Sequence, residues 1–391
     1  MMKVAKTVWL LPALLVGLHP APAATFVVAN TSDNGTGSLR NAIEQANGTA
    51  GTNFITFNIP GTNIHTIHLT TSLPAITRPT IINGYSQPGA TSNTLAYGNN
   101  AQIRIELDGS MIADFHGLEI LASHSTVRGL AVYGFPADAV LISGDAASSN
   151  VVAGNFIGTD ATGTNLIGNL YSGVHLESGA SGNRIGGEFP GDRNRIAGNS
   201  GSGISLLDSE TTRNAILGNE VFANGDLGID LGYDGVTTND FNDSDGGPNG
   251  LQNFPTITYA ESDSGSIQGT LTSAPTTAYR IEFFASDTPD ASGFGQGQTF
   301  LGATNLMTDS GGTTNFSFTT AGFIPPDAYV TASATDPFGN TSEFSQVHAA
   351  TSGPPASKLF INGVLITNDA VSATNIAYAE LRSTFSTSGI F

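Results

Sequence analysis

Short runs of β-branched and leucine residues recur through the middle of the chain. Each run has four residues, and successive runs begin 22, 34, 30 and 25 residues apart. The intervals hold further short β-branched runs separated by Gly, Asn or Ser, with no apolar residues at helical spacing. Short strands at this interval predict a solenoid in which each repeat forms one turn. The five runs are GLEI at 117–120, AVLI at 139–142, GVHL at 173–176, GISL at 203–206 and GIDL at 228–231.

A second repeated pattern has the form N-x-I-x-G-N. In a solenoid, equivalent turns lie about 4.8 Å apart, so an Asn side chain at a corner can bond the Asn above and below it. We therefore expect an asparagine ladder of Asn155, Asn199 and Asn219, each after a glycine that takes a backbone conformation other residues resist. The pattern is NVVAGN at 150–155, NRIGGE at 183–188, NRIAGN at 194–199 and NAILGN at 214–219.

The same kind of strand extends upstream, as in ITFNI at 55–59 and TIING at 80–84. Together these segments predict eight or nine turns up to residue 254. The first turn would expose unpaired strand edges, so a cap is expected. SLRNAIEQAN at 38–47 predicts one, because Ser38 suits a helix N-cap and the apolar residues after it share one face of a short helix.

The pattern changes after residue 254. Strands of 6 to 10 residues follow one another with turns between them, for example YRIEFFAS at 279–286 and AYVTASATD at 328–336. This spacing predicts an antiparallel sandwich of about seven strands over 255–350. Residues 351–391 form a C-terminal tail of unknown structure, too short to fold alone.

Several segments together resemble a broad group of exported bacterial right-handed parallel β-helix repeat proteins. The resemblance covers about residues 25 to 346. It implies an all-β fold: a right-handed parallel β-helix with a short N-terminal capping helix over 25–254, then an immunoglobulin-like sandwich. It implies no particular function. The matching segments are TSDNGTGSLRNAIEQAN, NGYSQPG, IELDGS, STVRGL, the N-x-I-x-G-N turns, LQNFPTI and ATDPFGNTSEFS.

The N-terminus and the charge limit the partners. Residues 1–24 combine two lysines, a short apolar run and APAA, which predicts a bacterial signal peptide and a secreted or cell-surface protein. No apolar run is long enough to span a bilayer. The net charge is −19, and a nucleic-acid partner is improbable because binding would need a basic stripe. There are no cysteines, so disulfides do not stabilise the fold.

An acid-rich loop, NDFNDSDGG at 239–247, lies between the two predicted domains. Calcium takes six to eight oxygen ligands, which closely spaced Asp and Asn side chains can supply. The spacing differs from an EF-hand loop, because no Glu stands at the twelfth place. We expect a structural Ca²⁺ here, and a solvated linker without an ion is the alternative. The candidate ligands are Asp234, Asp240, Asn242, Asp243 and Asp245.

Candidate catalytic residues come from the outward positions of the repeated strands. The third residue of a run is Glu119, His175 or Asp230 in three of the five runs. Successive members of this set are two turns apart, which corresponds to about 10 Å. Glu177 shares the face of His175. Arg184, the variable residue of its N-x-I motif, could contact acidic sugars through paired hydrogen bonds or could simply offset the negative charge.

Two classes of function follow. The first is a non-catalytic module that binds extracellular polysaccharide or a cell-surface glycan or protein, or acts as an adhesive or structural element. The second is a pectate-lyase-like polysaccharide lyase or glycoside hydrolase acting on acidic polysaccharide. An enzyme predicts a groove where the carboxylates and Arg184 converge, whereas a scaffold predicts polar residues spread evenly along the rod.

Overall fold

The structure is a computed structural model that describes residues 23–352, 359–361 and 364–366. The predicted signal peptide and most of the predicted tail lie outside the described residues. Strands dominate, and the one α-helix of the described part is α1 (Leu39–Gly48). Short 3₁₀ helices are η1 (Gly84–Ser86), η2 (Pro190–Asp192) and η3 (Pro248–Leu251). The chain is therefore mostly β with few helices, as the sequence predicts.

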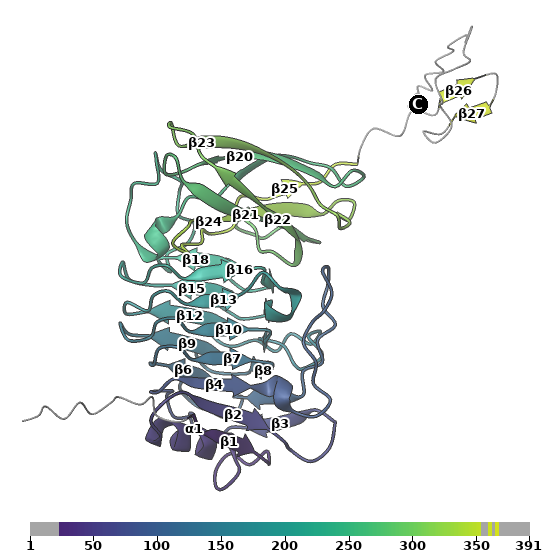
Figure 1. Ribbon diagram of the computed structural model, residues 1–391. Coiled ribbons are helices and arrows are strands. Elements are labelled where there is room, and N and C mark those ends of the chain that lie inside the picture. The colour runs from purple at the N-terminus through teal and green to yellow at the C-terminus, as the bar shows by residue number, and fades with distance from the viewer. Residues whose placement is uncertain (1–22, 353–358, 362–363, 367–391) are drawn as a thin grey trace, which may run out of the picture.

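Three stacked parallel sheets form the first part of the fold (Figure 1). Their strands follow chain order along each sheet. Sheet A has seven strands, the most of the three. Sheet A contains β1 (Thr25–Val28), β2 (Asn53–Phe57), β4 (Thr80–Asn83), β7 (Thr126–Arg128), β10 (Val151–Ala153), β13 (Arg184–Gly186) and β16 (Ala215–Leu217).

The other two sheets share this arrangement. Sheet B contains β3 (His65–His68), β5 (Ile105–Asp108), β8 (Leu130–Tyr133), β11 (Phe156–Ile157), β14 (Arg195–Ala197) and β17 (Glu220–Phe222). Sheet C contains β6 (Leu118–Ile120), β9 (Val140–Ser143), β12 (Val174–Glu177), β15 (Ile204–Leu206) and β18 (Ile229–Leu231). The five runs that set the repeat in the sequence are thus the five strands of sheet C, in the expected order.

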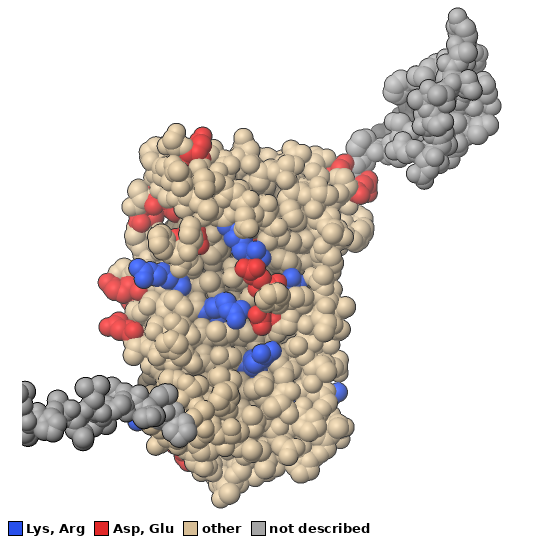
Figure 2. Space-filling model, viewed as in Figure 1, with Lys and Arg blue, Asp and Glu red and all other residues tan. Residues whose placement is uncertain are grey.

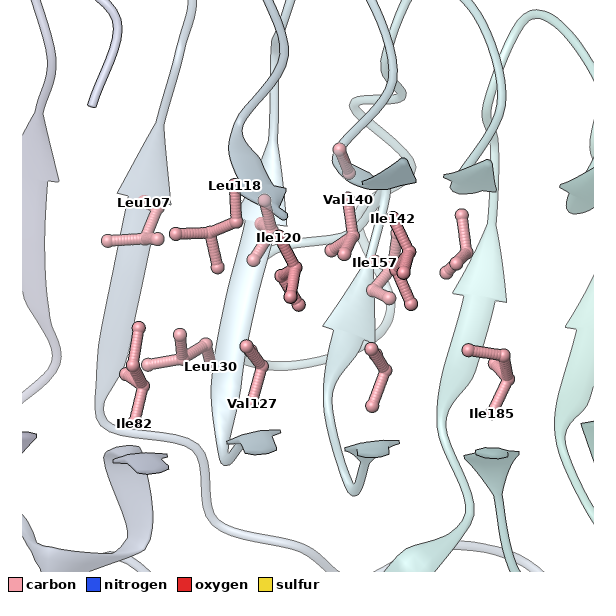
Figure 3. Close-up of a cluster of buried hydrophobic side chains, with 14 of the residues drawn as sticks. Ile82, Leu107, Leu118, Ile120, Val127, Leu130, Val140, Ile142, Ile157 and Ile185 are labelled. Atoms are coloured by element: carbon pink, nitrogen blue, oxygen red, sulfur yellow. The ribbon is translucent and has the colours of Figure 1, made fainter. Parts of the chain in front are cut away.

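Apolar side chains fill the space between the sheets in rows, as Figure 3 shows. Ile82 pairs with Val127, Val127 with Val152, and Val152 with Ile185, and all four are fully buried. Strand side chains alternate between faces, so an in-register stack places the same inward position over itself in every turn. Burying each such side chain contributes about 1.5–3 kcal/mol.

The helix α1 lies at the N-terminal end of the stack (Figure 1) and packs on β1 and β2. The Ser38 hydroxyl accepts a hydrogen bond from the Asn41 backbone N–H at 3.2 Å, as an N-cap does. The buried face of α1 consists of Leu39, Ala42, Ile43 and Ala46. The predicted N-terminal cap is present.

Buried asparagines form three ladders rather than one. Asn155 and Asn219 belong to the same ladder, with Asn194 between them: Asn155 N–H donates to Asn194 Oδ1 at 2.9 Å, and Asn194 N–H to Asn219 Oδ1 at 3.2 Å. Asn199 belongs to another ladder, where its N–H donates to Asn224 Oδ1 at 3.1 Å. The prediction that Asn155, Asn199 and Asn219 form one ladder is therefore wrong for Asn199.

The cause is that the motif occupies two different corners. The copies beginning at Asn150, Asn183 and Asn214 precede strands of sheet A, whereas the copy beginning at Asn194 precedes β14 of sheet B. Asn199, which ends that copy, therefore lies one corner further along the turn. The third ladder runs through Asn150, Asn183, Asn214 and Asn249.

Residues 256–349 form two antiparallel sheets with seven strands. One sheet contains β19 (Thr256–Ala260), β20 (Ser266–Thr272) and β23 (Thr313–Thr319). The other contains β22 (Thr299–Met307), β21 (Ala278–Ser286), β24 (Tyr329–Thr335) and β25 (His348–Ala349). Their shared core includes Phe283, which stacks on Phe318 with ring centroids 4.6 Å apart. Beyond them, β26 (Leu359–Ile361) pairs with β27 (Val364–Ile366).

The antiparallel part covers the C-terminal end of the parallel stack (Figure 1). The last strand of each parallel sheet would otherwise leave backbone N–H groups unpaired. Groups of the antiparallel part accept hydrogen bonds from the last strand of each sheet: Ile216 N–H to Thr341 Oγ1 at 2.9 Å, Val221 N–H to the Gly297 carbonyl at 2.8 Å and Leu231 N–H to Glu343 Oε1 at 3.0 Å.

Candidate functional site

The outward positions of sheet C form one continuous row. Glu119 pairs with Leu141, Leu141 with His175, His175 with Ser205, and Ser205 with Asp230. The sequence-derived candidates Glu119, His175 and Asp230 therefore share a face, as expected from the position of each in its strand. Ser205 and Asp230 are nevertheless buried.

A second polar row runs beside the first, at the corner before each strand. Its members stand two residues before the first residue of β6, β9, β12 and β15, and they are His116, Asp138, Ser172 and Ser202. The Asp138 carboxylate lies 3.1 Å from His116 Nδ1 and accepts a hydrogen bond from the Ser172 N–H at 2.7 Å. The sequence analysis missed these residues, although aligning the five repeats by their strands would have revealed them.

The imidazole of His116 is set in negative surroundings. Its hydrogen bond with Asp138 raises the pKa of His116, the charges of Glu119 and Glu177 act in the same direction, and burial opposes them. This imidazole therefore stays protonated to a higher pH than an ordinary histidine.

His175 lies at the centre of the row. Its Nδ1 is 2.7 Å from Ser205 Oγ, and Ser205 Oγ is 2.8 Å from Ser172 Oγ. On the other side, His175 Nε2 lies 3.5 Å from Glu177 Oε2. Ser205, His175 and Glu177 thus contact one another in a row. Ser205 is 0% exposed, however, so no substrate carbonyl can reach its hydroxyl.

His175 and Glu177 line a groove of about 380 Å³ together with His116 and Asp138, and it is here called the sheet C groove. Two tyrosines border it: Tyr171 is 50% exposed and Tyr233 is 43% exposed. The rings of Tyr233 and His175 meet edge to face with centroids 5.9 Å apart. Among the described residues, no Lys or Arg lines the groove, and its polar members are Asp114, His116, Asp138, Tyr171, His175, Glu177 and Tyr233.

A second cavity of about 600 Å³, the junction cavity, adjoins the groove through Tyr233. It lies where the last turn of the parallel stack meets the loop before β22. Four carboxylates line it, and they are Asp226, Asp230, Asp234 and Asp290. Burial raises the pKa of Asp230, opposed by nearby N–H groups and the Ser202 hydroxyl.

Arg184 does not join the other candidates. It lies on β13 of sheet A, where Nη1 contacts Asp192 Oδ2 at 3.2 Å. Figure 2 shows the basic side chains of this face beside acidic ones. Only nine residues separate Arg184 from His175 in the chain, but the corner between them turns it onto another sheet.

The acid-rich loop brings part of the predicted calcium set together. Carboxylate oxygens of Asp240, Asp243 and Asp245 lie within 4.8 Å of one another. Burial raises the pKa of Asp243 to about 6, against hydrogen bonds from the Asn253 N–H and the Ser273 hydroxyl. The two remaining candidates lie differently: Asn242 Oδ1 is buried without a hydrogen-bond partner, and Asp234 lines the junction cavity.

Across the described residues, no helix has the length and apolar character needed to cross a bilayer. No protein-family model matches this chain, and no curated protein matches it.

Proposed function

We propose that this protein is a secreted or cell-surface module that binds saccharides without cleaving them. Its frame is a right-handed parallel β-helix, capped by α1 and closed by an immunoglobulin-like sandwich. The order of strands in the three parallel sheets and the seven antiparallel strands support this frame. The sheet C groove is the binding site.

The observation that carries the proposal is the pairing of two exposed tyrosines with buried polar groups in one groove. Tyr171 and Tyr233 offer aromatic faces on which the C–H surface of a sugar ring can pack. Asp138, His175 and Glu177 offer acceptors and donors to sugar hydroxyls. Hydrogen bonds from neighbouring serines, namely Ser172 to Asp138, Ser205 with His175 and Ser143 to Glu177, fix their positions before a ligand arrives, which lowers the entropic cost of binding.

The charge of the groove defines the ligand. Four acidic side chains (Asp114, Asp138, Glu177 and the adjoining Glu119) stand in or near the groove, and no Lys or Arg of the part of the chain that the structure describes lines it. A uronic-acid polymer would bring further negative charge to this surface and be repelled. The ligand is therefore a saccharide without net negative charge.

The same features argue against the lyase alternative. A lyase of the kind considered needs a basic residue beside its acidic groups, and Arg184 is on sheet A, paired with Asp192. The serine nearest His175 is buried. The groove thus has the chemistry of recognition without an accessible nucleophile or an arginine base.

A glycan array followed by calorimetric titration tests the proposal. Binding to uncharged glycans is expected, with no binding to uronic-acid polymers. Tyr171→Ala should weaken binding about fivefold to tenfold through the lost aromatic contact. Tyr259→Ala is the matched control, because Tyr259 is 37% exposed on β19, outside the groove.

Two outcomes would contradict this function. Equal affinity in Tyr171→Ala and the unsubstituted protein would remove the groove as the site. New reducing ends, or absorbance of an unsaturated product, would show that the protein is an enzyme.

A further inference from the structure

We infer that Glu343 of the antiparallel part is a positioning residue for the sheet C groove, because its carboxylate holds both ends of the loop that carries Tyr233. This loop consists of residues 232–236 and is here called the Tyr233 loop. The inference rests on the proposed function, and it adds that the antiparallel part helps to set the affinity of the groove for its saccharide.

The Glu343 carboxylate bridges the two ends of the Tyr233 loop. Its Oε1 accepts a hydrogen bond at 3.0 Å from the N–H of Leu231, the residue just before the loop. Its Oε2 accepts one at 2.9 Å from the N–H of Thr237, the residue just after it. Hydrogen bonds to a carboxylate are among the stronger ones, and Glu343 is only 3% exposed. One buried side chain thus fixes the distance between the loop ends.

The backbone of the Tyr233 loop needs such support. Tyr233 has a φ of 60°, a left-handed conformation that residues with a side chain rarely adopt. Such a conformation persists only where the surrounding contacts hold it. Within the loop, the N–H groups of Asp234 and Gly235 donate to the Asp230 carboxylate. Two carboxylates, one from each part of the fold, therefore hold the loop at its middle and at its ends.

Glu343 is fixed by the contacts of its neighbours in the chain. It lies between β24 and β25, where the Ser342 N–H donates to the Ala334 carbonyl of β24 at 2.9 Å. The next residue, Phe344, is buried in the apolar core of the parallel stack. The segment that carries the carboxylate is therefore attached to both cores, and the loop ends bind to a rigid point.

Tyr233 links this support to the groove. Its ring meets the His175 ring edge to face with centroids 5.9 Å apart, and it borders the groove with 43% of its surface exposed. An aromatic ring that is already held in place loses little conformational freedom when a sugar packs on it. Releasing one end of the loop would restore that freedom and weaken binding.

Amide hydrogen exchange tests the positioning without a ligand. Glu343→Gln replaces one carboxylate oxygen with an amino group, so the N–H of either Leu231 or Thr237 loses its acceptor. Exchange in residues 231–237 should become about tenfold faster, the effect of losing one hydrogen bond. Burial raises the pKa of Glu343 to about 7, so measurements at pH 8 keep the unsubstituted carboxylate ionised.

Glu282→Gln is the matched control. Glu282 is also a buried carboxylate of the antiparallel part, and it accepts a hydrogen bond from the Gly218 N–H of the parallel part at 2.7 Å. Gly218 lies between β16 of sheet A and β17 of sheet B, whereas the groove lies on sheet C. This variant should weaken the junction but leave exchange in residues 231–237 and glycan affinity unchanged.

Calorimetric titration shows whether Glu343 acts through Tyr233. The probe is the uncharged glycan that binds most tightly on the array. Glu343→Gln should weaken its binding about threefold to tenfold, because the ring is no longer held in place. In a Tyr233→Ala background the same substitution should have no further effect, whereas in a Tyr171→Ala background its effect should remain.

Unchanged exchange of residues 231–237 in Glu343→Gln overturns the inference and leaves the proposed function standing. Equal acceleration in Glu282→Gln also overturns it, and so does an equal loss of affinity with and without the Tyr233 ring, because Glu343 would then act through the whole junction. Failure of every glycan on the array to bind overturns the proposed function, and the exchange experiment then decides by itself whether Glu343 holds the loop.

Discussion

Gln296 of the antiparallel part occupies the position that a further asparagine would take after Asn224. Its Oε1 accepts hydrogen bonds from the Asn224 N–H at 3.1 Å and from Asn224 Nδ2 at 3.0 Å, and its Nε2 donates to the Asn224 carbonyl at 3.0 Å. The longer Gln side chain reaches from the antiparallel part to the end of a ladder formed by the parallel part. The two parts of the fold are therefore joined through a buried polar network.

Removing Gln296 should destabilise that junction. In Gln296→Ala, the donors of Asn224 lose their acceptor in a buried site, so the free energy of unfolding should fall by about 1–3 kcal/mol. Denaturant unfolding measures this change. Gln268→Ala, at an exposed position on β20, is the control and should be near neutral. A loss no greater than the control's would argue against a junction stabilised by the ladder.

The same reasoning applies within the ladder at Asn199. Asn199 Oδ1 accepts from Asn169 Nδ2 at 2.8 Å, and Asn199 Nδ2 donates to Asn224 Oδ1 at 2.9 Å. Asn199→Ala removes both of these buried side-chain hydrogen bonds and should cost about 1–3 kcal/mol in thermal or denaturant unfolding. Asn315→Ala, exposed on β23, should cost far less. A neutral Asn199→Ala would show that the ladder contributes nothing to stability.

The Glu343 carboxylate should make stability depend on pH. Burial raises its pKa from 4.5 to about 7, although the N–H groups of Leu231 and Thr237 bond it. Between these two pH values the folded protein holds a proton that the unfolded chain releases. The free energy of unfolding therefore falls as pH rises through that window, by about 3 kcal/mol from this group.

Comparison with Glu343→Gln isolates this contribution. The variant cannot ionise, so its melting temperature should decline less between pH 5 and pH 8 than that of the unsubstituted protein. The measured quantity is the difference between the two pH profiles, because other acids titrate equally in both proteins. Parallel profiles would show that Glu343 has an ordinary pKa.

Calcium binding by the acid-rich loop remains a prediction from the sequence, and the convergence of Asp240, Asp243 and Asp245 supports it. If the loop holds calcium, a chelator should lower the melting temperature by several degrees, since the ion stabilises the folded state by mass action. Asp245→Asn, which removes one exposed ligand, should reduce the shift. Identical melting with calcium and with chelator would eliminate the site.

Part of the candidate site could be predicted because strand alternation is a local property. Glu119, His175 and Asp230 hold the third place in their runs, and the structure places them in one row. The residues two places before each strand also repeat in every turn, so the row that contains His116 and Asp138 could have been predicted in the same way. An ordered stack of parallel strands repeats every turn's geometry, so equal places in the repeat become neighbours.

Other features could not be predicted from the repeat. Arg184 follows His175 closely in the chain yet lies on a different sheet, and Asn199 has the motif of Asn219 but belongs to another ladder. The same residue types suit every corner of a turn, so the residues of a motif do not show which corner the motif occupies. That depends on the lengths of all the loops in the turn.

The strands, their inward and outward faces, and the helix at the N-terminal end follow from the sequence alone, because side-chain alternation and capping act over a few residues. The packing of distant segments brings Tyr171 and Tyr233 to one groove, Asp230 and Asp290 to one cavity, and Gln296 to the end of a ladder. Such pairs lie tens of residues apart in the chain. Their contact depends on how loops fold over the sheets and how two separate cores pack, and no short stretch of sequence encodes that packing.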